Sequence, residues 1–148
     1  MDDREHVNTN NARLEDQKNA LDKIRDGNFC PFCSREYMET EHPHPIILEN
    51  DHWFATKNRW QYEGAKVHLL LVYKGDHITH TKELSDKAWT SLREITNRLC
   101  DQFSIPGGTF IMRFGDSQYT GATVTHLHAQ IVSGPGESGA DPILVRVG

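Results

Sequence analysis

The sequence predicts an α+β fold, with a mostly antiparallel sheet of five or six strands, one central helix and one N-terminal helix. Short segments of strand length recur along the chain without the regular strand–helix alternation that produces parallel sheets. Two longer stretches carry apolar residues at helical spacing. The 148 residues suffice for one domain with a hydrophobic core of its own.

The first half of the chain is expected to hold one helix and three strands. The helix covers residues 12–26, where Leu14, Leu21 and Ile24 recur at helical spacing and Gly27 is a stop signal. PIILEN and HWFATK are two short strands that share the turn ENDH. The apolar run KVHLLLVY is the third strand.

The second half is expected to hold the central helix and the remaining strands. Ser85 is a suitable N-cap for a helix that runs to about Phe103. The apolar stripe of this helix consists of Trp89, Leu92, Ile95, Leu99 and Phe103. The strands that follow are TFIMRF, the segment GATVTHLHAQIVSG and the terminal PILVRV.

The composition narrows the classes of partner and compartment. The formal charge of −5 argues against a protein that binds a nucleic-acid polymer, because its contact surface would be basic. No apolar run reaches the roughly 18 residues of a membrane span, and the acidic start MDDREH is not a signal peptide. We therefore expect no membrane partner. Three cysteines, an odd number, indicate a reducing compartment, so a cytoplasmic protein is expected.

Two histidines and a glutamine alternate with apolar residues in the segment 126–131. In a strand, His126, His128 and Gln130 share one face and their apolar neighbours share the other. The alternation alone is also typical of a solvent-facing polar row. The preceding YTGATV, with a glycine and two threonines, favours instead a loop whose backbone amides approach an oxyanion.

Cys30 and Cys33 are separated by two residues, which is the gap of both redox and zinc sites. A redox pair of the thioredoxin type would open a helix after a strand in a βαβ unit, and the sequence predicts no such unit. Zinc commonly takes two thiolates and two imidazoles. A structural zinc site is therefore predicted, with two reduced thiols that no longer bind metal as the alternative.

The segment around the two histidines resembles the signature of a known family. GATVTHLHAQIV resembles the signature of the histidine triad (HIT) superfamily, in which His-φ-His-φ-His/Gln follows a Gly-x-Ser/Thr loop. NFCPFC, two strands, HLLLVYKGDHITHTKEL and a helix precede it in the family's order, so the resemblance covers residues 28–133. It implies a HIT-like domain over residues 28–148, after a polar tail and helix over residues 1–27. Homodimers that join through the central helix and the adjoining strand are common in the family.

The resemblance also implies a covalent enzyme that acts on nucleotides. His128 matches the histidine that attacks the α-phosphorus and forms a nucleotidyl-histidine intermediate. Backbone amides from Thr123 to Thr125 would hold the phosphate oxygens. The other implied site residues are Gln130 and His126 for catalysis, and His68, Asn58, Thr123 and Gly121 for binding the nucleotide and its phosphate.

In zinc-bearing relatives the cysteine pair is completed by a histidine after the LLV strand and by the first signature histidine. The implied ligands are Cys30, Cys33, His77 and His126, with His80 as a competitor of His77. Zinc on His126 would hold the start of the strand that carries His128.

The sequence departs from the family at one position. The family commonly has an asparagine shortly before the signature, where this chain reads MRFGD. Arg113 or Asp116 can take that place, and Arg113 is the preferred phosphate ligand because a guanidinium binds phosphate bidentately. The alternative for Arg113 is an ordinary charge on the surface of the sheet.

Two functions are carried forward. The first is an enzyme that cleaves a nucleotidyl phosphoanhydride or related bond, for example in a dinucleoside polyphosphate, as a hydrolase or as a phosphorylase or nucleotidyltransferase. The alternative is a zinc-stabilised nucleotide-binding module without significant turnover. The His-x-His-x-Gln form with Gln130 resembles the transferase and phosphorylase branch of the family, whose hydrolases usually have a third histidine. An amide does not release a proton at neutral pH as imidazolium does. The chain length instead resembles that of the family's small hydrolases.

Overall fold

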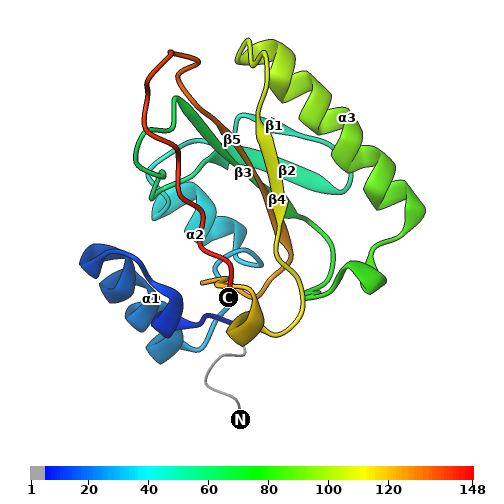
Figure 1. Ribbon diagram of the computed structural model, residues 1–148. Helices are drawn as coiled ribbons and strands as arrows, with labels where there is room; N and C mark the ends of the chain where they lie inside the picture. The colour runs from blue at the N-terminus through cyan, green and yellow to red at the C-terminus, as the bar shows by residue number, and fades with distance from the viewer. Residues whose placement is uncertain (1–5) are drawn as a thin grey trace.

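The computed structural model describes residues 6–148, so the first five residues of the predicted N-terminal tail lie outside the described part. Three helices and one five-stranded sheet form the fold (Figure 1). The helices are α1 (Glu15–Gly27), α2 (Arg35–Thr40) and α3 (Asp86–Gln102), and the strands are β1 (Leu48–Glu49), β2 (Trp53–Lys57), β3 (Val67–Tyr73), β4 (Thr109–Met112) and β5 (His128–Ser133). The strand order is β1-β2-β3-β5-β4 and every pairing is antiparallel, which confirms the predicted α+β fold.

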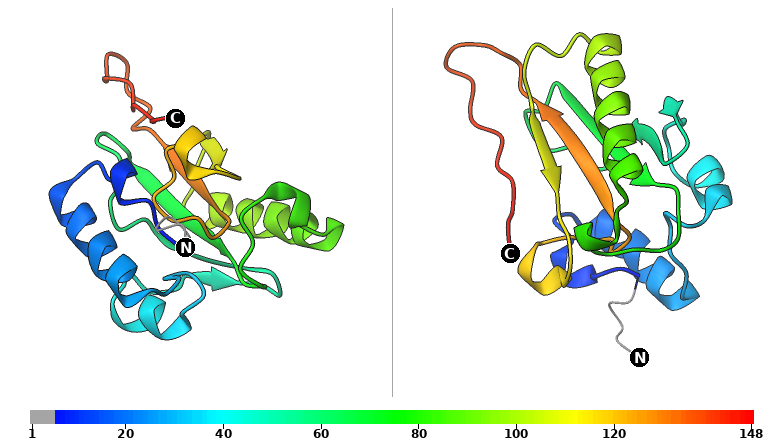
Figure 2. Two further views of the ribbon diagram at one scale, coloured as in Figure 1. Left: turned by 90° about the horizontal axis from the view of Figure 1, so that it is seen from below. Right: turned by 90° about the vertical axis from the view of Figure 1, so that its right-hand side faces the viewer.

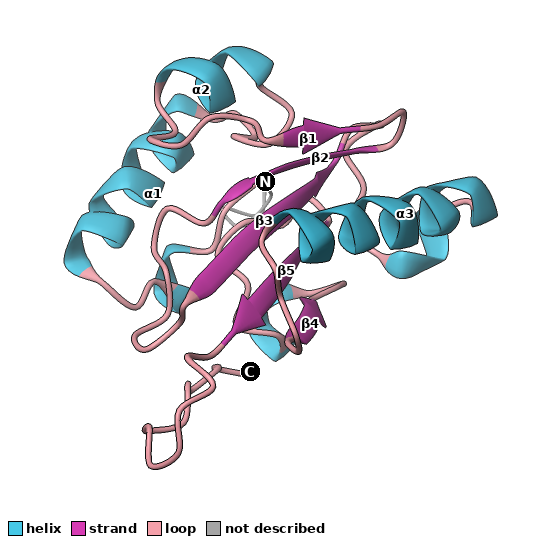
Figure 3. Cartoon of the chain, turned by 90° about the horizontal axis from the view of Figure 1, so that it is seen from above, coloured by secondary structure: helices cyan, strands magenta, loops and turns pink. Residues whose placement is uncertain are grey.

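The two faces of the sheet carry different side chains and different helices. Ala55, Leu71 and Ala129 belong to the face that packs against Leu92, Ile95 and Leu99 of α3. Trp89 was predicted to share this apolar stripe but is instead 41% exposed. On the opposite face, Leu70 and Val72 pack with Met38 of α2. Figure 3 shows the sheet between α3 on one side and α1 and α2 on the other. Because side chains alternate along a strand, the face opposite α3 is also the face of His128 and Gln130.

Both predicted helices form. Ser85 caps α3 by accepting a hydrogen bond from the Ala88 amide at 3.1 Å, as predicted. At the end of α1, Asn28 rather than Gly27 adopts the left-handed conformation, with φ of 50°. Leu14 precedes α1 and is 46% exposed. The buried apolar side chains of α1 are therefore those of Leu21 and Ile24.

Two parts of the chain differ from the prediction. The helix α2 forms where no helix was predicted, because Ser34 accepts a hydrogen bond from the Tyr37 amide and the α2 side chain Met38 is buried. The terminal PILVRV does not form a sixth strand. Leu144 and Val147 are 83% and 82% exposed, so this segment buries too little apolar surface to be held in the sheet, and Figure 2 shows it as an extended coil.

None of the helices in residues 6–148 is long and apolar enough to cross a membrane.

Candidate functional site

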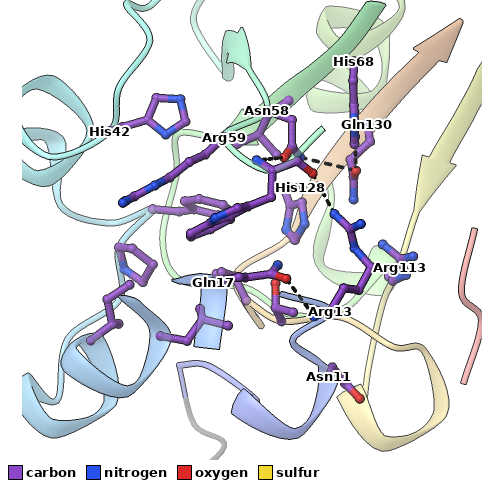
Figure 4. A pocket seen from close by; sticks show the side chains of 18 of the residues that line it. Asn11, Arg13, Gln17, His42, Asn58, Arg59, His68, Arg113, His128 and Gln130 are labelled. Atoms are coloured by element: carbon purple, nitrogen blue, oxygen red, sulfur yellow. Dashed lines mark hydrogen bonds between the residues drawn. The ribbon is translucent and has the colours of Figure 1, made fainter. Parts of the chain in front are cut away.

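A pocket opens on the face of the sheet opposite α3. Its walls come from α1, from the loop around Trp60, from the loop 120–125 and from the C-terminal Arg146. Figure 4 shows Gln17 of α1 and Asn58 of the loop around Trp60 on different sides of His128. The pocket is lined by all but one of the implied catalytic and nucleotide-binding residues, namely Asn58, His68, Arg113, Gly121, Thr123, His128 and Gln130.

His128 is held in one tautomer by its own strand. Its Nδ1 donates a hydrogen bond to the His126 carbonyl oxygen at 2.8 Å, so Nε2 keeps its lone pair in the neutral ring. The side chain is 8% exposed, and burial lowers the pKa of His128 to about 4, with the charge of Arg113 acting in the same direction. The ring is therefore a neutral imidazole at physiological pH, which is the form that can act as a nucleophile.

Gln130 is oriented by a chain of hydrogen bonds. The Tyr62 amide donates to His68 Nδ1 at 3.0 Å, so the proton of the neutral His68 ring is on Nε2. That Nε2 donates to Gln130 Oε1 at 2.6 Å. Burial lowers the pKa of His68, as do the charges of Arg13 and Arg113, while the bond to Gln130 raises it. The Gln130 side-chain carbonyl thus accepts a hydrogen bond within the protein, and the Gln130 NH₂ group is left to bind a ligand.

Asn58 belongs to the same network. Its side-chain nitrogen donates to Gln130 Oε1 at 3.5 Å, and its Oδ1 accepts a hydrogen bond from the Trp60 amide at 2.8 Å. Asn58 therefore ties the Trp60 loop to the catalytic strand, in addition to lining the pocket.

The loop 120–125 is braced by the segment at residues 6–14, which we call the N-terminal arm. Val7 pairs with Val124 in an antiparallel bridge, and the Asn8 amide donates to the Thr123 carbonyl oxygen at 2.9 Å. The Thr125 amide donates to the His6 carbonyl oxygen at 2.9 Å. The expectation that the amides from Thr123 to Thr125 all face a phosphate is therefore wrong at Thr125, because that amide is already used.

Gly121 lets this loop turn close to the C-terminal segment. Its φ of +76° is a left-handed conformation, and a Cβ there would meet the Arg146 carbonyl oxygen at 3.4 Å. The same carbonyl oxygen accepts a hydrogen bond from Arg113 Nη2 at 2.8 Å, and Arg113 Nε donates to the Thr120 carbonyl oxygen at 2.8 Å. Arg113 thus lies in the pocket, whereas Asp116 caps a short 3₁₀ turn, Ser117–Tyr119, outside it.

The charge of the pocket is strongly biased. Four arginines line it, and none of the described lining residues carries a carboxylate, although the whole chain has a formal charge of −5. Of these arginines, only Arg113 was predicted from the sequence, whereas Arg13, Arg59 and Arg146 were not. No local motif marks these three arginines, because they come from distant parts of the chain. The arrangement suits an anionic ligand.

Four potential metal ligands gather beside the pocket. The ligand atoms of Cys30, Cys33, His77 and His126 all lie within 4.8 Å of one another. His126 Nδ1 is 3.5 Å from Cys30 Sγ and 3.2 Å from Cys33 Sγ, and His77 Nδ1 is 3.5 Å from Cys33 Sγ. His80 instead caps the 3₁₀ turn Thr81–Glu83, so it is not part of this group.

The hydrogen bond that His126 donates from Nε2 leaves Nδ1 available as a metal ligand. Its Nε2 donates to the Tyr73 carbonyl oxygen at 2.7 Å, so Nδ1 presents a lone pair to the two sulfurs. His126 does not line the pocket, and its backbone carbonyl instead receives the hydrogen bond from His128. The metal-binding group and the pocket thus share one short segment of chain.

Comparison with known proteins identifies the family. No protein-family model and no curated protein matches the sequence. The fold is similar to that of a HIT family hydrolase from Clostridium thermocellum, with 28% sequence identity, a TM-score of 0.56, and coverage of 78% of this chain and 96% of that one. This chain belongs to the HIT superfamily.

Other HIT structures share the fold at lower identity. A Zn-bound histidine triad family protein from Mycobacterium smegmatis is 15% identical over 77% of this chain and 81% of that chain, with a TM-score of 0.57. A histidine triad nucleotide-binding protein from Candida albicans is 17% identical over 79% of this chain and 87% of that chain, with a TM-score of 0.56. In this HIT chain, His128 and Gln130 of the signature line the pocket described above.

Proposed function

We propose that this HIT protein is an enzyme that cleaves a nucleotidyl phosphoanhydride or related bond through a covalent intermediate on His128. The observation that carries the proposal is the His128 tautomer, since a neutral ring with its Nε2 lone pair free lines a pocket with four arginines and no carboxylate. A dinucleoside polyphosphate is a representative substrate. The name of the 28% identical neighbour, a HIT family hydrolase, supports an enzyme of this general type.

The reaction takes place in two displacements. The Nε2 lone pair of His128 forms a bond to the α-phosphorus, the bond from phosphorus to the leaving oxygen breaks, and its electron pair leaves with that oxygen. A water or phosphate oxygen then attacks the same phosphorus. The P–N bond breaks, the electron pair returns to Nε2, and the proton of the attacking group goes to solvent or to the leaving group.

The neighbouring residues bind and orient the phosphate. The Gln130 NH₂ donates to a phosphate oxygen while its carbonyl stays bonded to His68 and Asn58. Thr123 and Gly121 bring the loop 120–125 against the phosphate, and Arg113 supplies positive charge. His126 acts indirectly, since its carbonyl oxygen accepts the His128 Nδ1 proton and strengthens as an acceptor when the ring becomes charged.

The acceptor in the second step distinguishes a hydrolase from a phosphorylase. No group in the His68–Gln130 pair can release a proton at neutral pH without losing the bond that orients the amide. We therefore infer that an acceptor that is already anionic, such as phosphate, is used more effectively than water. The four arginines also favour entry of an anionic acceptor.

We further propose a structural zinc ion held by Cys30, Cys33, His77 and His126. With Zn–S of about 2.3 Å and Zn–N of about 2.05 Å, tetrahedral geometry separates sulfur and nitrogen ligands by about 3.6 Å. The observed separations of 3.2–3.5 Å are close to this value. Burial raises the pKa of the Cys30 thiol to about 12, and a divalent cation would supply the positive charge that a buried thiolate needs. When bound, zinc would fix the segment that leads into His128.

A homodimer is also proposed. The strand β4 is last in the sheet order, so its outer edge pairs with no strand among residues 6–148. Phe110 on this strand is 44% exposed. Pairing of two β4 edges would satisfy the free backbone groups and cover Phe110. Light scattering after size-exclusion chromatography would give twice the chain mass, and a monomer at micromolar concentration would contradict the proposal.

The central experiment looks for the covalent intermediate. The zinc-loaded protein is incubated with a dinucleoside polyphosphate labelled at the α-phosphorus, quenched, and examined for label on the protein. Product release is followed with and without inorganic phosphate. A label that His128→Ala abolishes, while zinc content stays unchanged, is expected. Phosphate-dependent release of a nucleoside diphosphate identifies the phosphorylase.

The same experiment can contradict the proposed enzymatic function. Measurable nucleotide binding with neither label nor product would leave a zinc-stabilised nucleotide-binding module. A label that persists in His128→Ala would assign the nucleophile elsewhere. His126→Ala is the matched variant, and it should lose metal together with activity.

A further inference from the structure

We propose that Arg13, which the N-terminal arm carries into the pocket, binds a second anionic group of the substrate, beyond the phosphate that His128 attacks. Arg13 would then select nucleotides with two or more phosphates over monophosphates. This inference rests on the proposed nucleotidyl transfer, which defines the attacked phosphate. It adds to that function a substrate-binding residue from outside the signature segment and its surrounding strands.

The guanidinium of Arg13 has neutral partners. Its Nη2 donates to the Trp60 carbonyl oxygen at 2.7 Å, and its central carbon lies 4.6 Å from the centroid of the Tyr62 ring. Among residues 6–148, no carboxylate forms an ion pair with it. A guanidinium has five N–H donors, so most of its donors are not used by the Trp60 carbonyl. Figure 4 shows the side chain reaching from the start of α1 toward His128 and Gln130.

A second guanidinium contacts the same tyrosine. Arg113 Nη2 donates to the Tyr62 hydroxyl at 3.3 Å, so one tyrosine holds Arg13 over its ring and Arg113 at its hydroxyl. Tyr62 also packs against His68, with ring centroids 4.5 Å apart and ring planes tilted by 34°. Two positive charges so close together repel each other, and an anion between them removes that repulsion. The first phosphate has Gln130 and Arg113 as partners, and Arg13, which shares Tyr62 with Arg113, is placed to bind the next anionic group.

The arm that carries Arg13 is fixed to the pocket at several points. The Asn11 side-chain nitrogen donates to the carbonyl oxygens of Ser117 at 3.0 Å and Ala122 at 2.7 Å. On the other side of Arg13, the Asp16 carboxylate accepts a hydrogen bond from Trp60 Nε1 at 3.1 Å. Arg13 is therefore preorganised beside the loop 120–125, which lowers the entropic cost of using Arg13 to bind a ligand.

The test measures how affinity depends on the number of phosphates. Dissociation constants for nucleoside monophosphates and diphosphates of adenosine, guanosine and uridine are determined by calorimetry on the zinc-loaded full chain, with chromatography to check that the nucleotide stays intact. For the base that binds best, the diphosphate should bind about tenfold more tightly than the monophosphate, since one charge-assisted hydrogen bond is worth at least that factor.

Arg13→Gln should abolish this preference while changing monophosphate affinity less than about threefold, and Arg13→Lys should restore it in part because the charge is kept. The control is Arg25→Gln, which removes the same charge from α1, where Arg25 pairs with Asp22 and Asp26 away from the pocket. This control should keep the tenfold preference. Circular dichroism and the retained monophosphate affinity establish that Arg13→Gln is folded.

Two results would overturn the inference. Arg13→Gln could keep the preference for diphosphate, as Arg25→Gln is expected to do, or it could lose monophosphate affinity by the same factor as diphosphate affinity. Failure of the proposed function would look different, because no label would form on His128 while the binding preference still depended on Arg13. With turnover, Arg13→Gln should slow a dinucleoside polyphosphate about tenfold and leave a nucleoside phosphoramidate with a neutral leaving group nearly unchanged.

Discussion

His68 Nε2 donates a 2.6 Å hydrogen bond to Gln130 Oε1, and this contact determines what an amide does at the third position of the signature. A reversed amide would require both His68 nitrogens to accept a hydrogen bond and therefore to lack a proton, which a neutral imidazole does not allow. The NH₂ group of Gln130 is thus the donor available to a phosphate, and the side chain is a fixed dipole rather than an acid.

Gln130→Glu tests this role because it replaces the NH₂ group with an oxygen of nearly the same size. Formation of the nucleotidyl-protein intermediate should fall by about 100-fold, the loss typical for a donor to a developing oxyanion. The measurement is the single-turnover rate of labelling. Gln102→Glu at the exposed end of α3 makes the same chemical change outside the pocket and should keep the wild-type rate. A wild-type rate in Gln130→Glu would exclude the donor role.

Asn11→Ala is predicted to loosen the loop 120–125. The mutation removes the donor to the Ser117 and Ala122 carbonyl oxygens, which are left unpaired, so the free energy of unfolding should fall by about 2 kcal/mol. Urea denaturation measures this loss, and KM should rise at the same time. Asn10→Ala, at an exposed neighbouring position of the arm, should change either quantity little. Equal effects of the two substitutions would contradict the bracing role of Asn11.

His77→Ala is predicted to lose the metal, whereas His80→Ala is predicted to keep it. Only His77 lies with Cys33 and His126 in the group of ligand atoms. The readouts are zinc per chain after dialysis and the unfolding temperature, which should drop by about 10 °C when the ion is lost. Removing zinc from the wild type with a chelator should give the same drop. A chain that holds zinc equally well in both variants would refute the ligand set.

Glu49→Gln is predicted to reduce stability most above about pH 4.5, and progressively less as the pH falls toward 2. Arg35 at 3.0 Å and Lys74 at 2.9 Å hold the pKa of Glu49 at about 2, below the ordinary value of 4.5. Because the folded pKa is the lower one, the stabilisation is complete above 4.5 and disappears as the pH falls toward 2. Glu49 is 39% exposed, so solvent screening limits the effect to less than about 1 kcal/mol.

Thermal unfolding from pH 2 to pH 7 measures the difference between wild type and Glu49→Gln. The two curves should converge at the acidic end, and 1 M salt should bring them together at pH 7 as well. A difference that stays constant with pH would mean that the charge of Glu49 is not its source.

Local periodicity was enough to predict most elements of this fold. The alternation in HAQIV and the helical stripe of Leu92, Ile95 and Leu99 reflect backbone geometry, and each forms the predicted element. The helix α2 was missed because six residues are too few to show a period. The predicted strand PILVRV was wrong because a strand also needs a paired neighbour, which no local pattern reveals.

At the site, the chemical groups could be recognised from the sequence, namely two alternating histidines, a glutamine and a cysteine pair with a metal-ligand gap. Those features are local and can be read within a few residues. That His77 rather than His80 lies with the cysteines, and that Arg13 and Arg146 line the pocket of His128, follows from the tertiary structure alone. The physical reason is that such contacts join segments far apart in the chain, and their geometry follows from how the helices and loops pack on the sheet.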